Sequence, residues 1–200
     1  MQLKLKSVRL SYPALFEPKA GPEGGDPKYS ASLLMDKENN EPEIEAMREG
    51  ILSVAKAQWG AEKVKWNENT SALKLMLPTG KVAMVKVCLR DGDEKSGTAG
   101  YENVMFFSAS SKLPAPVVDK NPAIALTAAT GRPYAGCYVN ASIRLWAQDN
   151  NFGKRVNAQL QAVQFAADGE SFGDGPVNAE SVFENIEGSG GKAPEGDEPF

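Results

Sequence analysis

Apolar and polar residues alternate along several short stretches of the chain, as they do in β-strands with one buried face. The clearest stretch covers residues 136–147, and a second covers residues 155–162. Their apolar positions are Val139, Ala141, Ile143, Leu145, Val156, Ala158, Leu160 and Ala162. The polar segment Gln148–Gly153 separates the two stretches, which predicts a β-hairpin with one core-facing side.

Shorter strands are predicted at Leu3–Tyr12, Lys28–Met35 and Val104–Ala109, and also at residues 73–77 and 82–90. In the first strand the apolar positions change parity after Leu5, which predicts a bulge near Lys6 and Ser7. The Pro- and Gly-rich residues 13–27 predict a long irregular loop, and residues 112–133 fit no element.

One helix is expected over residues 40–60. Pro42 and early acidic residues favour a helix start after Asn40, and Gly60 favours its end. Its apolar stripe is Ile44, Met47, Ile51, Leu52, Ala55 and Trp59. The fold class that follows is mainly β, with one helix and long loops.

A chain of 200 residues, 42% of them hydrophobic, is sufficient for one globular domain with an extension. No apolar run is long enough to span a bilayer, and the N-terminus lacks a secretory pattern, so a cytoplasmic protein without membrane contact is expected. Cys88 and Cys137 predict buried thiols. Histidine is absent, which removes most hydrolase triads.

The net charge of −4 divides unevenly along the chain. Residues 1–167 carry 21 Lys and Arg against 17 Asp and Glu, a net charge of +4, whereas residues 168–200 carry one Lys against nine acids, a net charge of −8. We therefore expect a basic domain over 1–167 and a disordered acidic tail over 168–200. A basic body of this kind suits a polyanion.

Aromatic and cationic side chains are interleaved on the polar side of the predicted hairpin. The candidate DNA-binding residues are Tyr138, Arg144 and Trp146 on that side, together with Phe152, Lys154 and Arg155 at and just after the turn. Rings that stack on exposed bases, beside cations that follow the phosphates, are what single-strand binding requires. The alternative is that Trp146 and Tyr138 pack under the long loops.

Weaker candidates lie on other predicted strands. Lys86 and Arg90 share the polar parity of residues 82–90, and Lys28 precedes a core-facing Tyr29. Trp66 is either a second stacking platform or a cap on the core. The acids near Asp91 lack the pattern of a calcium loop, and no complete phosphate-binding loop occurs, so no metal, cofactor or catalytic residue is predicted.

The chain ends with Asp197, Glu198, Pro199 and Phe200. The simplest interpretation is a solubilising acidic end. Alternatively, a terminal ring and carboxylate behind acidic residues can be captured by an apolar pocket with basic residues around it. These four residues resemble the tips of bacterial single-stranded-DNA-binding proteins, which implies recruitment of a partner protein.

Three segments together resemble a bacteriophage family of single-stranded-DNA-binding proteins, first catalogued as a domain of unknown function. They are Leu10–Phe16, Lys28–Lys37 and Cys137–Trp146. The resemblance spans residues 1–167 and implies an oligonucleotide/oligosaccharide-binding (OB) fold, a five-stranded barrel. Residues 150–156 would then be the loop between its fourth and fifth strands.

The expected function is a non-enzymatic protein that coats and protects single-stranded DNA during phage DNA replication, recombination or repair, in the cytoplasm of the bacterial host. The tail would recruit replication or recombination proteins and compete with DNA. Binding to double-stranded DNA or RNA stays open, as does a homo-oligomer. The alternatives are a phage structural or assembly protein that does not bind DNA, and a metal-dependent nuclease.

Overall fold

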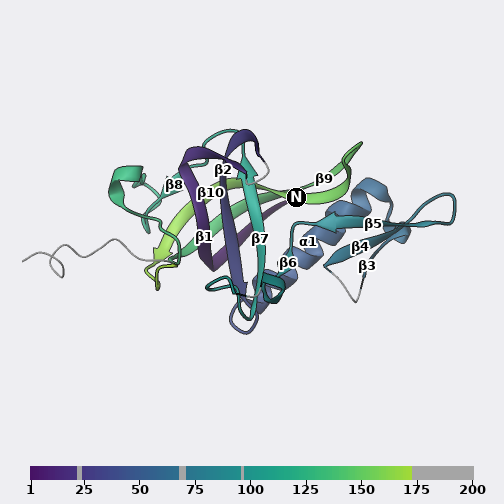
Figure 1. Ribbon diagram of the computed structural model, residues 1–200, viewed down its shortest axis with the longest axis horizontal. Helices are drawn as coiled ribbons and strands as arrows, with labels where there is room; N and C mark the ends of the chain where they lie inside the picture. The colour runs from purple at the N-terminus through teal and green to yellow at the C-terminus, as the bar shows by residue number, and fades with distance from the viewer. Residues whose placement is uncertain (22–23, 68–70, 96, 173–200) are drawn as a thin grey trace, which may run out of the picture.

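The computed structural model describes residues 1–21, 24–67, 71–95 and 97–172. Five long strands form a closed barrel (Figure 1). They are β1 (Gln2–Gly21), β2 (Gly24–Asp36), β7 (Val104–Ser111), β9 (Tyr138–Asn150) and β10 (Gly153–Ala167). Around the barrel they run β1, β2, β7, β10, β9 and back to β1, and the parallel pairing of Ala158 with Ala109 joins β10 to β7. This confirms the predicted five-stranded, OB-like barrel.

The core lies inside the barrel, where the apolar parity of each strand points. Val139, Ala141, Ile143 and Leu145 of β9 are all buried, as predicted. Ala162 of β10 is only half-buried, because a register shift between Leu160 and Ala162 changes the parity of the strand. Val163 and Phe165 fill the core beyond the shift, so the alternation predicted through Ala162 ends at Leu160.

The predicted bulge in β1 is confirmed. Leu5 pairs with Ala141 and Val8 with Val139, so the register against β9 shifts between them. Ser7 takes a left-handed backbone conformation with φ of 49°. The extra residue keeps both Leu5 and Val8 in the core, since without it one of them would face outward.

The irregular loop predicted over residues 13–27 is wrong. β1 continues to Gly21 and β2 begins at Gly24, so most of this segment is a long hairpin that extends beyond the barrel. Pro13 and Pro18 are accommodated because the register of β1 against β2 shifts between Ser11 and Ala14 and again between Ala14 and Lys19.

The helix α1 (Glu41–Trp59) follows Asn40 and ends before Gly60, as predicted. Ile44, Met47, Ile51 and Ala55 are buried against the barrel, whereas Leu52 and Trp59 are half-buried. Gly50 allows this close approach, because a Cβ there would lie 2.9 Å from the Leu145 side chain.

A small antiparallel sheet follows the helix (Figure 1). Its strands are β3 (Val64–Trp66), β4 (Ala72–Met76) and β5 (Val82–Val87). Two short strands, β6 (Arg90–Asp91) and β8 (Val117–Val118), pair with β7 and β10. Single-turn helices η1 (Ala61–Lys63), η2 (Gly92–Lys95) and η3 (Ala128–Thr130) lie in the connections. The unplaced residues 112–133 therefore contain β8 and η3.

The last described residues, Asp168–Phe172, lie against the barrel. Arg9 donates a hydrogen bond to the Glu170 carbonyl at 2.7 Å, and the Phe172 amide donates to the Ala135 carbonyl at 3.0 Å. Contacts with the barrel thus continue beyond the boundary predicted at residue 167. The rest of the predicted tail, including its tip at Phe200, lies outside the described residues. Among those described, no helix is long and apolar enough to cross a membrane.

Candidate nucleic-acid interface

An open groove with a volume of about 720 Å³ crosses the outer surface of β7, β9 and β10. Most of its side chains come from the polar parity of these strands, opposite the core. Four cations and one exposed ring line it: Lys28, Lys112, Arg144, Arg155 and Trp146. The other lining residues are Cys88, Ser108, Ser110, Ser111, Gln148, Asn157, Ala158 and Gln159. We call this the strand groove.

Strand pairing explains why these residues meet. Trp146 lies opposite Asn157, Arg144 opposite Gln159, and Gln148 opposite Arg155. Asn157 also donates a hydrogen bond to the Gln148 side chain at 3.2 Å. The ring of Trp146, which is 42% exposed, therefore lies beside the guanidinium groups of Arg144 and Arg155 on two paired strands.

A second hollow of about 410 Å³ continues the strand groove toward the hairpin of β1 and β2. Lys28 and Ser110 line both hollows. The second hollow adds Tyr12, which is 64% exposed, and Lys19. It also contains Asp26, whose carboxylate lies 3.5 Å from the Lys112 ammonium group in an exposed ion pair. Such a pair contributes little to stability and leaves Lys112 available to a polyanion.

The strand groove brings together four of the predicted DNA-binding residues: Lys28, Arg144, Trp146 and Arg155. Lys86 flanks it, since it pairs directly with Arg155. Arg90 lies over the ring of Phe106 at 4.7 Å, on the same side of β7 as Ser108. For all of these the role in binding stays a prediction.

Three other predicted residues do not line the groove. Tyr138 lies at the far end of β9, 5.9 Å from the Arg9 guanidinium, and Phe152 is 82% exposed at the tip of the hairpin. Lys154 forms an ion pair with Asp149 and lies over the ring of Trp59 at 5.8 Å. Lys154 and its neighbour Arg155 point to opposite faces of β10, and Lys154 is on the face toward α1.

Trp66, left undecided from the sequence, packs partly against the core. It also lines a separate hollow beside α1, so the two interpretations of its ring both retain support.

Sequence reasoning missed Tyr12, Lys19, Lys112 and the serines of β7. The serines gave a signal, because Ser108 and Ser110 alternate with the buried Phe107 and Ala109. Tyr12 gave none: it is exposed because its backbone adopts φ of 45°, next to a register shift in β1.

The loop between β6 and β7 closes off one end of the outer surface of β2 and β7. Its Tyr101 is buried against Leu34 and Phe106, and its ring centroid lies 6.4 Å from that of Tyr12. Lys95 lies over the Tyr101 and Phe106 rings, and its pKa is lowered by burial and by the nearby Arg90.

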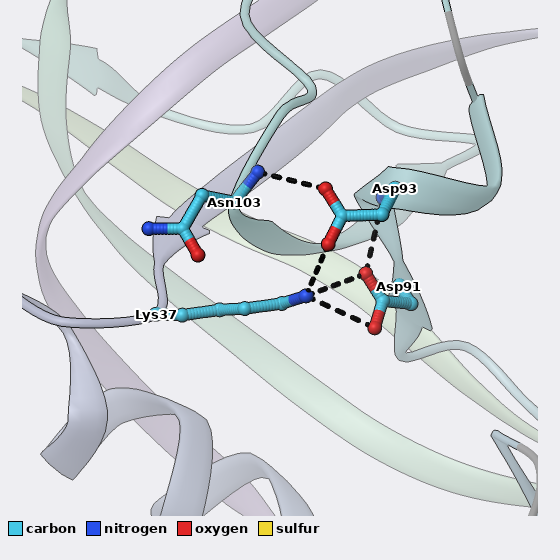
Figure 2. A network of polar contacts seen from close by, with 4 residues as sticks. All are labelled: Lys37, Asp91, Asp93 and Asn103. Carbon is cyan, nitrogen blue, oxygen red and sulfur yellow. Dashed lines mark hydrogen bonds and ion pairs between the residues drawn. The ribbon is translucent and has the colours of Figure 1, made fainter.

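A charged network holds this loop in place (Figure 2). Lys37, just after β2, contacts Asp91 at 2.8 Å and Asp93 at 2.7 Å, and Asp93 accepts a hydrogen bond from the Asn103 amide at 2.8 Å. These contacts lower the pKa of Asp93, first through Lys37 and then through Asn103. The acids near Asp91 therefore have a structural role, and the described part of the chain has no cluster of three metal-ligating side chains.

The chemistry of the strand groove is that of a binding surface. Its cysteine, Cys88, is a neutral thiol at physiological pH because burial raises its pKa to about 12. The remaining lining side chains offer hydrogen bonds, positive charge and one exposed indole, which are the groups that hold unpaired bases and phosphates.

The sequence and the fold of this chain are similar to those of known proteins. Residues 1–193 match the family model of the Enterobacter phage Enc34 ssDNA-binding protein. A putative protein, p50, from Acyrthosiphon pisum secondary endosymbiont phage 1 is 39% identical over 186 residues, which cover 93% of this chain and 94% of p50.

Solved structures are similar as well. The Enc34 single-stranded DNA-binding protein in complex with ssDNA has a TM-score of 0.68 and 30% identity, covering 86% of this chain and 89% of that one. The gp2.5 single-stranded DNA-binding protein of bacteriophage T7 has a TM-score of 0.50 at 12% identity, covering 86% and 95%, which shows a likeness of fold alone.

Proposed function

Since this chain belongs to the family of the Enterobacter phage Enc34 ssDNA-binding protein, we propose that it binds single-stranded DNA in the strand groove. One observation carries the proposal: four cationic side chains and the exposed Trp146 ring converge on one open groove of the barrel. Stacking of a base on Trp146 contributes roughly 1–3 kcal/mol, and the cations add a salt-dependent attraction for phosphates.

Binding without base-specific contacts would let the protein coat and protect single strands during phage DNA replication or recombination. The groove supports this, because the stacking contact from Trp146 suits any base and its cations address the phosphates. The proposed role is non-enzymatic, and its place of action is the cytoplasm of the bacterial host.

Two further parts of the proposal concern the tail. Its tip, Asp197–Phe200, would dock on a replication or recombination protein. Its length, which carries most of the −8 charge of residues 168–200, would compete with DNA for the cations of the strand groove. The tip and the residues from 173 onward lie outside the described residues.

The experiment that tests the groove is a fluorescence-anisotropy titration of labelled oligo-dT with the full chain and four variants. Trp146→Ala should weaken binding by roughly 5- to 150-fold, because it removes a stacking contact, while Trp146→Phe should retain most of the affinity. Arg144→Ala should weaken binding and make the slope of log K against log salt shallower by about 0.7. Arg48→Ala, the same change on α1, should have no effect.

Unchanged affinity in both Trp146→Ala and Arg144→Ala would rule out the strand groove as the binding site. Parallel titrations with duplex DNA and with oligo-U distinguish single-strand DNA binding from the alternatives left open by the sequence. Tighter binding to either competitor would replace single-stranded DNA as the proposed ligand.

A further inference from the structure

The small sheet of β3, β4 and β5 is joined to the barrel edge-on. β5 pairs in parallel with β10, with Lys86 opposite Arg155 and Val87 opposite Val156. In Figure 1 the three strands extend away from the barrel, beside α1. We call this three-stranded sheet the arm.

The two faces of the arm differ sharply. The inner face carries Val64, Leu73, Leu75, Val85 and Val87, which are all buried in the main core. The outer face carries three lysines, Lys65, Lys74 and Lys86, and three apolar residues, Met76, Val82 and Met84. The three apolar side chains are 48–54% exposed.

All charged side chains on the outer face of the arm are positive. Lys65 lies directly opposite Lys74, and Lys74 opposite Met84. Like charges directly opposite one another destabilise a sheet, and none of the three strands contains an acidic residue that could relieve the repulsion. The outer face keeps this repulsion between lysines and exposes apolar side chains between them. Such a face is suited to an anionic ligand with apolar parts.

The outer face of the arm is continuous with the strand groove. Arg155 lines the groove and pairs with Lys86 of the arm. Cys88 also lines the groove, two residues beyond Lys86 and on the same side of the chain. A strand that leaves the groove past Arg155 therefore meets Lys86 next, and then Lys74 and Lys65 on the neighbouring strands.

We propose that the outer face of the arm is a second contact surface for single-stranded DNA, which carries the strand beyond the groove. This inference rests on the proposed function. Lys65 lies about 10 Å from β5, two strand spacings away, a distance that a bound single strand spans with a few nucleotides. Aromatic rings are absent from the outward positions of these strands, so contact there depends mainly on charge.

The test compares two double variants of the full chain. Lys65→Gln/Lys74→Gln removes two charges from the arm, and Lys56→Gln/Lys120→Gln removes two exposed lysines from α1 and from the connection after β8. Each is titrated with oligo-dT of increasing length at several salt concentrations, and thermal unfolding followed by circular dichroism verifies that both are folded.

For the shortest dT oligonucleotide that the wild type binds, the arm variant should have the same affinity as the wild type. With longer oligonucleotides its affinity should stop rising at a shorter length than that of the wild type. Its salt slope for long DNA should be shallower by about 1.4, which is 0.7 for each lost phosphate contact. The control variant should keep the wild-type length dependence. Met84→Glu, which places an acid between the lysines, should reproduce the arm phenotype more strongly.

A length dependence and a salt slope equal to those of the control variant would overturn the inference. The inference would also be overturned if the arm variant bound long DNA normally but lost affinity for a peptide of residues 187–200, because the outer face of the arm would then dock an acidic peptide. If the wild type binds no oligonucleotide of any length, or if neither Trp146→Ala nor Arg144→Ala changes the affinity, the strand groove itself is wrong, which is a separate outcome.

Discussion

Individual side chains on the β9–β10 hairpin show how far sequence reasoning reaches. Alternation alone identified Arg144, Trp146 and Arg155 as outward-facing, and strand register brings all three to the strand groove. Lys154 and Phe152 were included only because they are near in sequence. A strand reverses its facing at each residue, so Lys154 lies against Asp149 and Trp59 instead.

The ion pairs of Lys37 give a pH dependence at the residue scale. The pKa of Asp93 is lowered below its ordinary value of 3.8, so its contribution to stability is present above that value and is lost as the pH falls through the lowered pKa. The pKa of Lys37 is raised above 10.5, so its contribution is present below 10.5 and is lost only as the pH rises through the raised pKa.

We therefore expect Asp93→Asn to be less stable than the wild type at neutral pH and to lose less stability on acidification. Thermal unfolding between pH 6 and pH 3 measures this, with the gap between the two proteins narrowing as the pH approaches the lowered pKa. Asp119→Asn, at an acid that forms no ion pair within the described residues, is the control. A gap that stays constant over this range would contradict the role of Lys37.

At the scale of elements, the sequence predicted those strands whose alternation is long and uninterrupted. It failed for residues 13–27, because Pro and Gly indicate a loop unless a partner strand with shifted register accommodates them. It also could not show that β7 and β10 pair in parallel, since that pairing joins segments far apart in the chain and depends on how the barrel closes.

The segment Asp168–Phe172 is a further element that composition did not indicate. Phe172 packs against the cluster of Leu34, Tyr101 and Phe106, and its ring lies 4.2 Å from the Arg9 guanidinium. Gly136 permits the close passage of this segment: it adopts φ of 105°, and a Cβ there would lie 2.1 Å from the Glu170 carbonyl oxygen. The described contacts with the barrel thus extend through Phe172.

Phe172→Ala should lower the free energy of unfolding by about 1–2 kcal/mol, because a half-buried ring and a cation–π contact are lost. Phe152→Ala makes the same chemical change at an exposed position and should leave stability within about 0.5 kcal/mol. Urea unfolding of both variants measures the difference. Equal stabilities would show that Phe172 does not anchor the segment.

At the scale of the whole molecule, the relevant feature is the contrast between the net charge of +4 over residues 1–167 and the net charge of −8 over residues 168–200. Competition between the acidic tail and DNA requires the two to share the same cations, and both the strand groove and the arm offer them. Contacts with the barrel extend through Phe172, so a deletion meant to remove only the competitor should begin at residue 173.

Deletion of residues 173–200 should tighten binding to oligo-dT severalfold at low salt, with the difference shrinking as salt increases, since screening weakens the competition. Titration of the full and shortened chains at matched salt concentrations measures the effect. A full-length chain in which the acidic residues of 173–200 are replaced by Gln separates the effect of charge from that of length. Equal or weaker binding after deletion would refute the competition.

The position of β10 in the barrel has a consequence for how the chain folds. β10, the last strand among the described residues, pairs with β5, β7, β8 and β9, so it closes the barrel against β7 and joins the arm and β8 to it. Contacts between segments distant in sequence form slowly, and the preceding strands expose unpaired edges until β10 arrives. A chain released before Gly153 should therefore aggregate instead of folding, which makes intact synthesis through Ala167 a condition for recovering any of the protein.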